Sequence, residues 1–174
     1  MNEQLTLRVP KEDEEPEFIR AHRATSSEVP FFLHYYSDGM PFRAYLDKLA
    51  DQRRGTNLPP NTVPSTFLFA FVGPRIVGRV SIRHTLNEFL EKIGGHIGYV
   101  VVSEFRRRGY ATEILRQALE IAREDLGIRR VLVTCDDDNV GSIRTIEKNG
   151  GRLENVIPGT DLEKAKRRYW ITTD

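Results

Sequence analysis

The stretch SEFRRRGYATEIL, residues 103–115, decides how this chain is expected to fold, because it joins a strand pattern to a helix pattern through a basic turn. The residues before it, GGHIGYVVV at 94–102, are apolar enough for a buried strand. From Gly109 to Glu124 the apolar positions follow helical spacing. The first amides of a helix have no acceptor within the helix, and a glycine there leaves room for a ligand. The turn therefore predicts a binding site for an anion such as a phosphate.

The other patterns along the chain alternate between strand and helix. Apolar runs bounded by turn residues predict strands at residues 5–9, 66–72, 76–84, 129–135, 152–157 and 167–173. Helical spacing with suitable end residues predicts helices at 11–24, 41–55 and 139–149. No repeat, linker or low-complexity segment interrupts this order. We therefore expect one mixed α/β domain over residues 1–174, a usual size for a single domain.

The overall composition argues against several classes of partner. Lys and Arg number 26 against 25 for Asp and Glu, and a net charge of +1 gives no general attraction to nucleic acid or to anionic membranes. The apolar stretches are shorter than the roughly 18 residues of a membrane span. No signal-peptide pattern is seen, so we expect a cytoplasmic protein. The four histidines are scattered without ligand spacing, and we expect no metal.

Two short motifs resemble a known family. RRRGYA, Arg106 to Ala111, resembles the Arg/Gln-x-x-Gly-x-Gly/Ala signature of the GNAT superfamily of N-acetyltransferases. NVGSIRTIEKNGG, residues 139–151, is similar to the second signature of that family, in which an asparagine opens a helix closed by a glycine pair. The resemblance implies a central, mostly antiparallel sheet of about seven strands with a splayed parallel pair, flanked by about four helices.

The resemblance also implies acetyl-CoA as the co-substrate. The amides of the basic turn would hold its pyrophosphate, and its pantetheine arm would pair with the strand that precedes the turn. The residues assigned to the cofactor in this way are Val100, Val102, Arg107, Arg108, Gly109, Tyr110, Ala111, Thr112, Asn139 and Ser142. A helix N-cap without any ligand role is the alternative for Asn139.

Transfer of an acetyl group to an amine needs a base, because an amine with a pKa of about 10.4 is mostly protonated at neutral pH. His96 is the first candidate and Glu104 the second, although His96 equally fits a histidine bonded within the sheet. The Val102 amide is the candidate for stabilising the oxyanion. Many members of the family carry a tyrosine as general acid where this chain has Ile146. A non-catalytic acyl-CoA binding domain is therefore the alternative.

The acceptor is expected to be a primary amine of a small molecule or a peptide, and the sequence does not identify it further. Tyr36 from FFLHYYSDG, residues 31–39, is one candidate for contacting it. The polar segment at 83–96 and the following strand supply His84, Asn87 and Tyr99. Relatives in the family often dimerise, so a homodimer is among the expected states.

Overall fold

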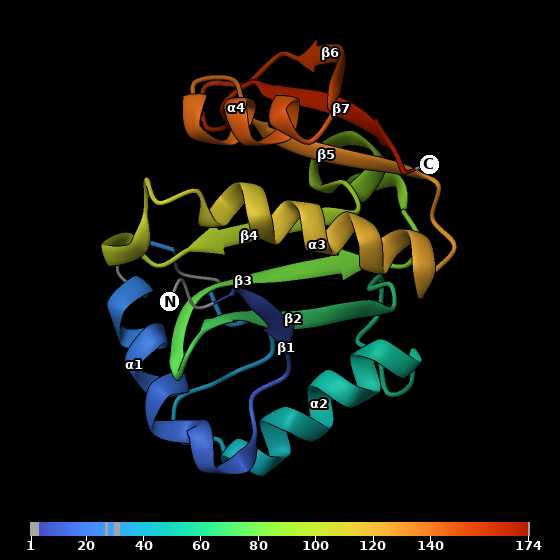
Figure 1. Ribbon diagram of the computed structural model, residues 1–174. Coiled ribbons are helices and arrows are strands. Elements are labelled where there is room, and N and C mark those ends of the chain that lie inside the picture. Colours follow the sequence, from blue (N-terminus) through green and yellow to red (C-terminus); the bar gives the residue numbers. More distant parts are fainter. Residues whose placement is uncertain (1–3, 27, 30–31, 174) are drawn as a thin grey trace.

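The structure, a computed structural model, describes residues 4–26, 28–29 and 32–173 (Figure 1). It contains one sheet with the strand order β1-β2-β3-β4-β5-β7-β6. The strands are β1 (Thr6–Arg8), β2 (Ser65–Val72), β3 (Arg75–Arg83), β4 (Ile97–Val101), β5 (Arg130–Asp136), β6 (Arg152–Ile157) and β7 (Lys166–Thr172). The α-helices of the described residues are α1 (Glu15–Thr25), α2 (Phe42–Arg54), α3 (Tyr110–Glu124) and α4 (Val140–Lys148). This confirms the predicted mixed, mostly antiparallel sheet.

The sheet has one parallel pair, formed by β4 and β5, and this pair is splayed. Ile97 opposite Val133 is the one ladder position that the two strands share, whereas β3 and β4 are paired from Gly78–Val101 to Ile82–Ile97. Beyond Ile97 the two strands diverge, so the edge of β4 that faces β5 lacks a neighbouring strand. The predicted splayed parallel pair is thereby confirmed.

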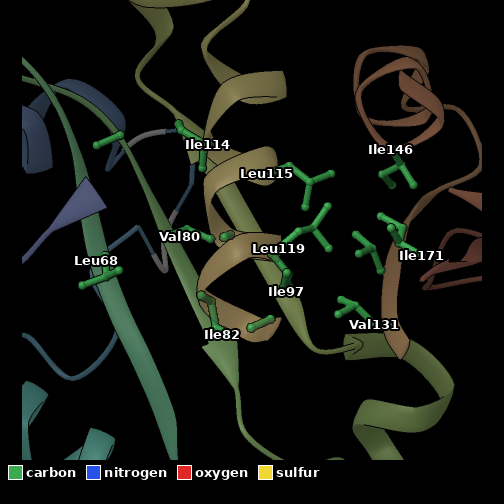
Figure 2. Close-up of a cluster of buried hydrophobic side chains, with 14 of the residues drawn as sticks. Leu68, Val80, Ile82, Ile97, Ile114, Leu115, Leu119, Val131, Ile146 and Ile171 are labelled. Carbon is green, nitrogen blue, oxygen red and sulfur yellow. The ribbon is translucent and has the colours of Figure 1, made fainter. Parts of the chain in front are cut away.

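Helices cover both faces of the sheet (Figure 1). On one face, α3 and α4 bury Ile114, Leu115 and Ile146 against the aliphatic side chains of the strands (Figure 2). On the other face, α1 and α2 pack around an aromatic cluster that includes Phe18 and Tyr45. Full burial of an aliphatic or aromatic side chain contributes roughly 1.5–3 kcal/mol, so these two cores hold the sheet between its helices.

The segment before β4 differs from its prediction. Residues 94–102 were expected as one strand, but β4 begins at Ile97 and a π-helical turn occupies Leu90–Gly94. Gly95 has a φ of +64°, and a Cβ there would lie 2.6 Å from the Leu132 carbonyl oxygen. The chain therefore makes a sharp, glycine-dependent entry into β4, which the apolar pattern alone does not reveal.

Among the described residues, no helix is long and apolar enough to cross a membrane.

Candidate active site

The turn between β4 and α3 offers a row of unpaired amides. Within the described residues, the N–H groups of residues 107–111 donate to no acceptor, and the first paired amide is that of Thr112, which donates to the Gly109 carbonyl at 3.1 Å. Arg107 and Gly109 have φ values of +61° and +84°, which turn the backbone sharply ahead of the helix. A Cβ on Gly109 would meet nothing within 4 Å, so the space beside these amides is open. The arrangement suits a phosphate group.

The three arginines of the turn have different surroundings. Arg106 forms an ion pair with Glu28 at 2.8 Å and donates from Nε to the Val101 carbonyl at 3.2 Å. Arg108 donates to the Glu104 carbonyl at 3.1 Å. Arg107 makes no hydrogen bond or ion pair with any described residue. Two of the arginines therefore fix the turn, and Arg107 keeps its charge available to a ligand.

The register of β4 decides which backbone groups face the splayed gap. The Val102 amide donates to the Val77 carbonyl at 2.9 Å, and the His96 carbonyl accepts from Arg83 at 2.8 Å. Backbone groups alternate along an antiparallel ladder, so residues 98 and 100 also bond to β3. The backbones of Tyr99 and Val101 consequently point toward β5, whereas the backbone of Val100, which was predicted from the sequence to hold the cofactor arm, faces β3. The expectation of a free Val102 amide is wrong, because β3 already uses it.

The N-terminus of α4 faces the same gap. The Asn139 side chain accepts from the Ser142 amide at 3.0 Å, as in a helix N-cap. The Tyr99 hydroxyl is buried close to Ser142 and hydrogen-bonds no described residue. Burial raises the pKa of Tyr99 to about 12, so the phenol is protonated at neutral pH. Tyr99 thus lies on the α4 side of β4, beside the predicted cofactor residues.

Cys135 and the acidic turn after it do not form a reactive centre. Burial raises the pKa of the Cys135 thiol to about 11, which leaves little thiolate at neutral pH. Asp136, Asp137 and Asp138 each pair with a basic side chain at or just before the start of β7. Within the described part of the chain, no group of three His, Cys, Asp or Glu side chains could hold a metal ion.

His96 lies at the joint between β4 and β5 and is 8% exposed. Its Nδ1 accepts from the Leu132 amide at 2.9 Å, and its ring contacts Trp170 edge-on. Burial and the nearby Arg83 lower its pKa to about 4, so the ring is neutral. Because Nδ1 is an acceptor, the neutral ring carries its proton on Nε2, and no free lone pair is left for a substrate proton.

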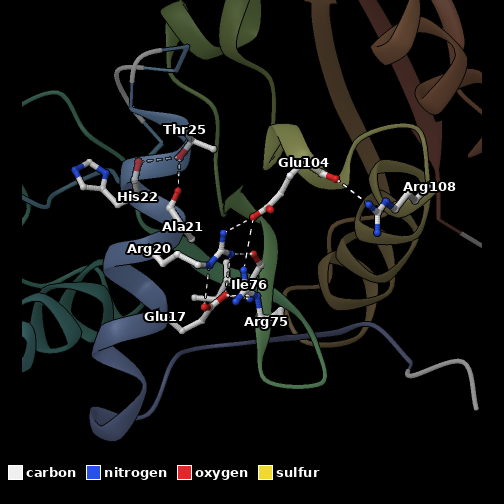
Figure 3. Close-up of polar contacts among 9 residues, drawn as sticks. All are labelled: Glu17, Arg20, Ala21, His22, Thr25, Arg75, Ile76, Glu104 and Arg108. Carbon is white, nitrogen blue, oxygen red and sulfur yellow. Dashed lines mark hydrogen bonds and ion pairs between the residues drawn. The ribbon is translucent and has the colours of Figure 1, made fainter.

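Glu104 lies at the other end of β4, beside the basic turn. Its carboxylate accepts from Arg20 at 2.5 Å and lies 3.7 Å from Arg75 (Figure 3). Arg20 also pairs with Glu17, so these side chains form one charged network across α1 and β3. His96 precedes the first residue of β4 and Glu104 lies in the turn after its last residue, so the two candidates lie at opposite ends of the strand. The structure does not bring these two candidates together.

A cavity of about 160 Å³ opens on the face of the sheet that α1 and α2 cover. Its floor consists of Phe67, Ser81 and Arg83, and its walls come from the segments 34–35, 61–65 and 87–90. Arg83 lies beside Gly98 of β4, because a Cβ at Gly98 would be 3.3 Å from its Nη1 atom. The cavity therefore reaches the strand whose far edge faces β5.

The predicted acceptor residues are dispersed around this face. Asn87 lines the cavity and bonds to the carbonyl of Asn61 at 3.0 Å. The Nε2 atom of His84 shares a hydrogen bond of 2.9 Å with the hydroxyl of Thr66. Tyr36 packs edge-on against Tyr45 in the aromatic cluster. Phe31 of the same aromatic stretch lies outside the described residues.

His34 was not singled out from the sequence, yet it lines the cavity. Its ring contacts Phe67 and Tyr35, and no described residue hydrogen-bonds to it. Burial, followed by the charges of Arg79 and Arg83, lowers the pKa of His34 to about 4. The ring is therefore neutral at pH 7 and keeps a lone pair that can accept a proton.

Comparison with known proteins identifies the family. The family model described as the acetyltransferase (GNAT) domain matches residues 4–152. The chain belongs to the GNAT acetyltransferase family. A curated relative in Bacillus subtilis, the uncharacterized N-acetyltransferase YnaD, is 32% identical over 72 residues, which are 40% of this chain and 42% of the relative. The matched part thus spans about two fifths of the length of that relative.

Solved structures share the GNAT fold at low sequence identity. The microcin C7 self-immunity acetyltransferase MccE, in complex with acetyl-CoA and AMP, aligns with a TM-score of 0.70 and 17% identity, covering 98% of this chain and 93% of MccE. The ribosomal L7/L12 α-N-protein acetyltransferase RimL, in complex with coenzyme A, aligns with a TM-score of 0.71 and 18% identity. The alignment covers 97% of this chain and 93% of RimL. The GNAT fold therefore extends over nearly the whole chain.

Sequence reasoning missed two residues that line the cavity, Arg83 and His34. One signal was present: Arg79, Ser81 and Arg83 place polar side chains on alternate positions of an otherwise apolar strand. Alternation puts such residues on one face of the sheet, and their burial there is unusual for arginine. His34 carried no comparable signal, because its segment has no regular periodicity.

Proposed function

We propose that this protein is an acetyl-CoA-dependent N-acetyltransferase that transfers the acetyl group directly to a primary amine of a small molecule or peptide. The observation that carries the proposal is the row of unpaired amides at residues 107–111, placed at the end of the splayed strand β4. Family membership supports it, as do the acetyl-CoA and coenzyme A complexes of MccE and RimL. Like the expected single domain over residues 1–174, the assignments below are proposals.

The cofactor lies between the basic turn and the edge of β4 in this proposal. Its pyrophosphate accepts from the amides of residues 107–111 and pairs with the Arg107 guanidinium. Its pantetheine arm bonds to the backbone of Tyr99 and to the amide of Val101, which point toward β5, while the Val101 carbonyl stays bonded to Arg106. Asn139 and Ser142, at the N-terminus of α4, form one side of the gap between β4 and β5. A backbone amide on this edge, in place of the Val102 amide, polarises the thioester carbonyl.

The acceptor amine approaches from the cavity on the opposite face of β4. His34 is assigned the proton because its ring lines the cavity and has an unshared nitrogen lone pair. With a pKa of about 4 this ring is a weak base, so it takes the proton only as the new carbon–nitrogen bond makes the amine nitrogen more acidic, and not from a free ammonium. The amine nitrogen attacks the thioester carbonyl, the carbon–sulfur bond breaks, and the thiolate leaves with the coenzyme. A thiol with a pKa of about 8.5 is a tolerable leaving group at neutral pH. Ile146 is fully buried in the core, so this release proceeds without an acid from that position.

Calorimetric titration with acetyl-CoA tests the cofactor site through a matched pair of glycine variants. Gly109 and Gly127 both have positive φ, +84° and +66°, both have open space where a Cβ would go, and they flank the same helix. Valine at either position carries similar backbone strain. We expect micromolar binding for the wild type and for Gly127→Val, and a loss of roughly 100-fold or more for Gly109→Val, because several charge-assisted hydrogen bonds are disturbed together.

Two outcomes of this titration would contradict the proposal. The first is no heat of binding for the wild-type protein, and the second is an equal loss in both variants. The non-catalytic alternative, favoured by the isoleucine at position 146, is tested by release of free thiol from acetyl-CoA in the presence of amines. Amine-dependent thiol release excludes that alternative as the sole role.

A further inference from the structure

The cavity on the acceptor face contains an arginine whose charge has no counterion among the described residues. Arg83 is partly buried on the floor of the cavity and forms no ion pair with a described side chain. Of its donors, Nη1 contacts the carbonyls of Gly94 and Gly95, at 3.2 and 3.4 Å. Its Nε and Nη2 groups donate to no described residue. A guanidinium has five N–H donors, so most of its capacity is unused.

The other walls of the cavity do not neutralise this charge. The described residues lining the cavity include no Asp or Glu, and His34 on the wall is neutral. Arg79 lies on the same face of β3, two positions along from Ser81, and adds a second positive charge nearby. A cationic site with low water access attracts an anion more strongly than an exposed one.

Arg83 lies close to the part of β4 where the proposed reaction takes place. Its Nη1 atom lies next to Gly98, one residue from Tyr99, whose backbone faces the splayed gap. One small molecule can therefore place its anionic group on Arg83 and its amine at this edge of β4, with only a few bonds between the two groups. The volume of about 160 Å³ is below the roughly 300–1,000 Å³ of pockets for drug-sized ligands, which favours a small acceptor.

The backbone of the cavity wall is strained at one residue, as is common at ligand sites. Tyr35, which lines the wall, has a φ of +70°, a left-handed conformation that is strained for a bulky residue. Strain of this kind persists where the surrounding structure imposes it, commonly at ligand sites. Here the strained residue is close enough to Arg83 to interact with it electrostatically.

We propose that Arg83 binds the carboxylate of a small amino acid-like acceptor, so that the substrate is an amine bearing a carboxylate a few bonds from its nitrogen. This inference rests on the proposed acetyltransferase function. Arg83 donates two hydrogen bonds to the carboxylate from Nε and Nη2, while Nη1 stays on the carbonyls of the π-helical turn. The carboxylate orients the substrate, and the amine is left pointing toward β4.

The test measures kcat/KM for glycine, β-alanine, γ-aminobutyrate and ε-aminocaproate, each beside the alkylamine that has a methyl group in place of the carboxylate. O-Phosphoethanolamine is the phosphate counterpart. We expect the best amino carboxylate to exceed its alkylamine at least about tenfold, as a charge-assisted bidentate pair allows. We also expect the preference to peak at a short member of the series, because Arg83 lies close to the reacting edge.

Variants separate recognition from folding. Arg83→Gln is expected to erase the preference by raising KM for the amino carboxylate, with little change for the alkylamine, and Arg83→Lys to restore part of it. Gly98→Ala, whose new Cβ would crowd Arg83 at 3.3 Å, is expected to raise the same KM. Arg152→Gln, on the exposed strand β6, is the control that leaves the preference intact.

Acetyl-CoA titration and direct titration of the amino carboxylate accompany the kinetics, so the two proposals fail separately. If acetyl-CoA does not bind but the amino carboxylate binds in an Arg83-dependent way, the proposed function fails and the carboxylate site stands. If acetyl-CoA is used but alkylamines or O-phosphoethanolamine are preferred, the carboxylate site is overturned. An equal effect of Arg83→Gln on every amine also overturns it, since that result indicates a structural role.

Discussion

Two groups of arginines in this protein differ in what faces them. Arg106, Arg107 and Arg108 form an exposed run after β4, and two of the three contact protein groups, either within a few residues or on Glu28 in the segment after α1. Arg79 and Arg83 are separate positions on β3 whose side chains lie on the buried face of the sheet. The run stands out in the sequence, whereas the buried pair is inconspicuous there.

The contrast shows that a run of arginines in a sequence does not indicate how many of them are free to bind a ligand. Arg106 is held by Glu28, so its role is to fix the turn rather than to meet a ligand. Burying a charge is costly, and a partly buried arginine without a carboxylate beside it, such as Arg83, keeps most of its hydrogen-bonding capacity for a ligand. If Arg83 binds the acceptor as proposed, it determines which substrate is used more than the exposed arginines at 106–108 do.

The largest expected effect comes from His34, which shares the cavity with Arg83. If His34 accepts the amine proton, His34→Gln lowers kcat/KM by about 100-fold while acetyl-CoA affinity is unchanged. His22→Gln, on α1 and outside the cavity, is the control. Steady-state kinetics with the best amine, beside calorimetry, measure both quantities. A His34→Gln enzyme with wild-type kcat/KM would show that the buried group serves packing alone.

An intermediate effect distinguishes the members of the exposed run. Arg107 has no partner among the described residues, so Arg107→Gln is expected to weaken acetyl-CoA binding about fivefold at low salt, and less at high salt. Arg106→Gln changes the affinity less than about twofold, because its guanidinium is already paired with Glu28. Calorimetry at two salt concentrations checks both values. Equal losses would mean that the run acts as a single charged patch.

The smallest expected effect is on stability against pH. The pKa values of His34 and His96 are about 4 in the folded protein, lowered first by burial and then by the arginines, against about 6.5 in the unfolded chain. Between these values the unfolded chain binds more protons, so stability falls as the pH is lowered from 6.5 to 4. Arg83→Gln raises both pKa values and flattens the decline. Urea unfolding midpoints of the wild type and of Arg83→Gln, measured from pH 7 to 4.5, test this prediction. The same dependence of the midpoint on pH in the two proteins would contradict the effect of Arg83 on the histidine pKa values.

Much of the fold was accessible from the sequence because its signals are local. The α3 pattern beginning at Gly109 and the hairpin around Gly73 depend on neighbouring residues, and the structure confirms both. The cavity depends on segments far apart in the chain, at 34–35, 61–65 and 87–90. No periodicity connects these segments, so only the folded chain reveals that His34 faces Arg83.

Individual site residues show the same limit. The pattern around Asn139 predicted a helix start, and the structure shows the N-cap. An asparagine at this position fits both an N-cap and a cofactor contact, so the sequence does not distinguish the two roles. The bond from the Leu132 amide to His96 joins two strands that are 36 residues apart, which no local rule anticipates. The free amide expected at Val102 failed for a related reason, because strand register decides which groups are used.

The single ladder position shared by β4 and β5 has a consequence for the motions of the protein. Strands β1 to β4 form one continuous antiparallel block, and β5, β7 and β6 form another. Such blocks open as separate cooperative units in hydrogen exchange. A cofactor arm that pairs with the exposed edge of β4 supplies the missing neighbour there, so binding slows exchange along the seam and couples the two halves. In the proposed complex, the arm of acetyl-CoA therefore takes the place of a missing strand between β4 and β5.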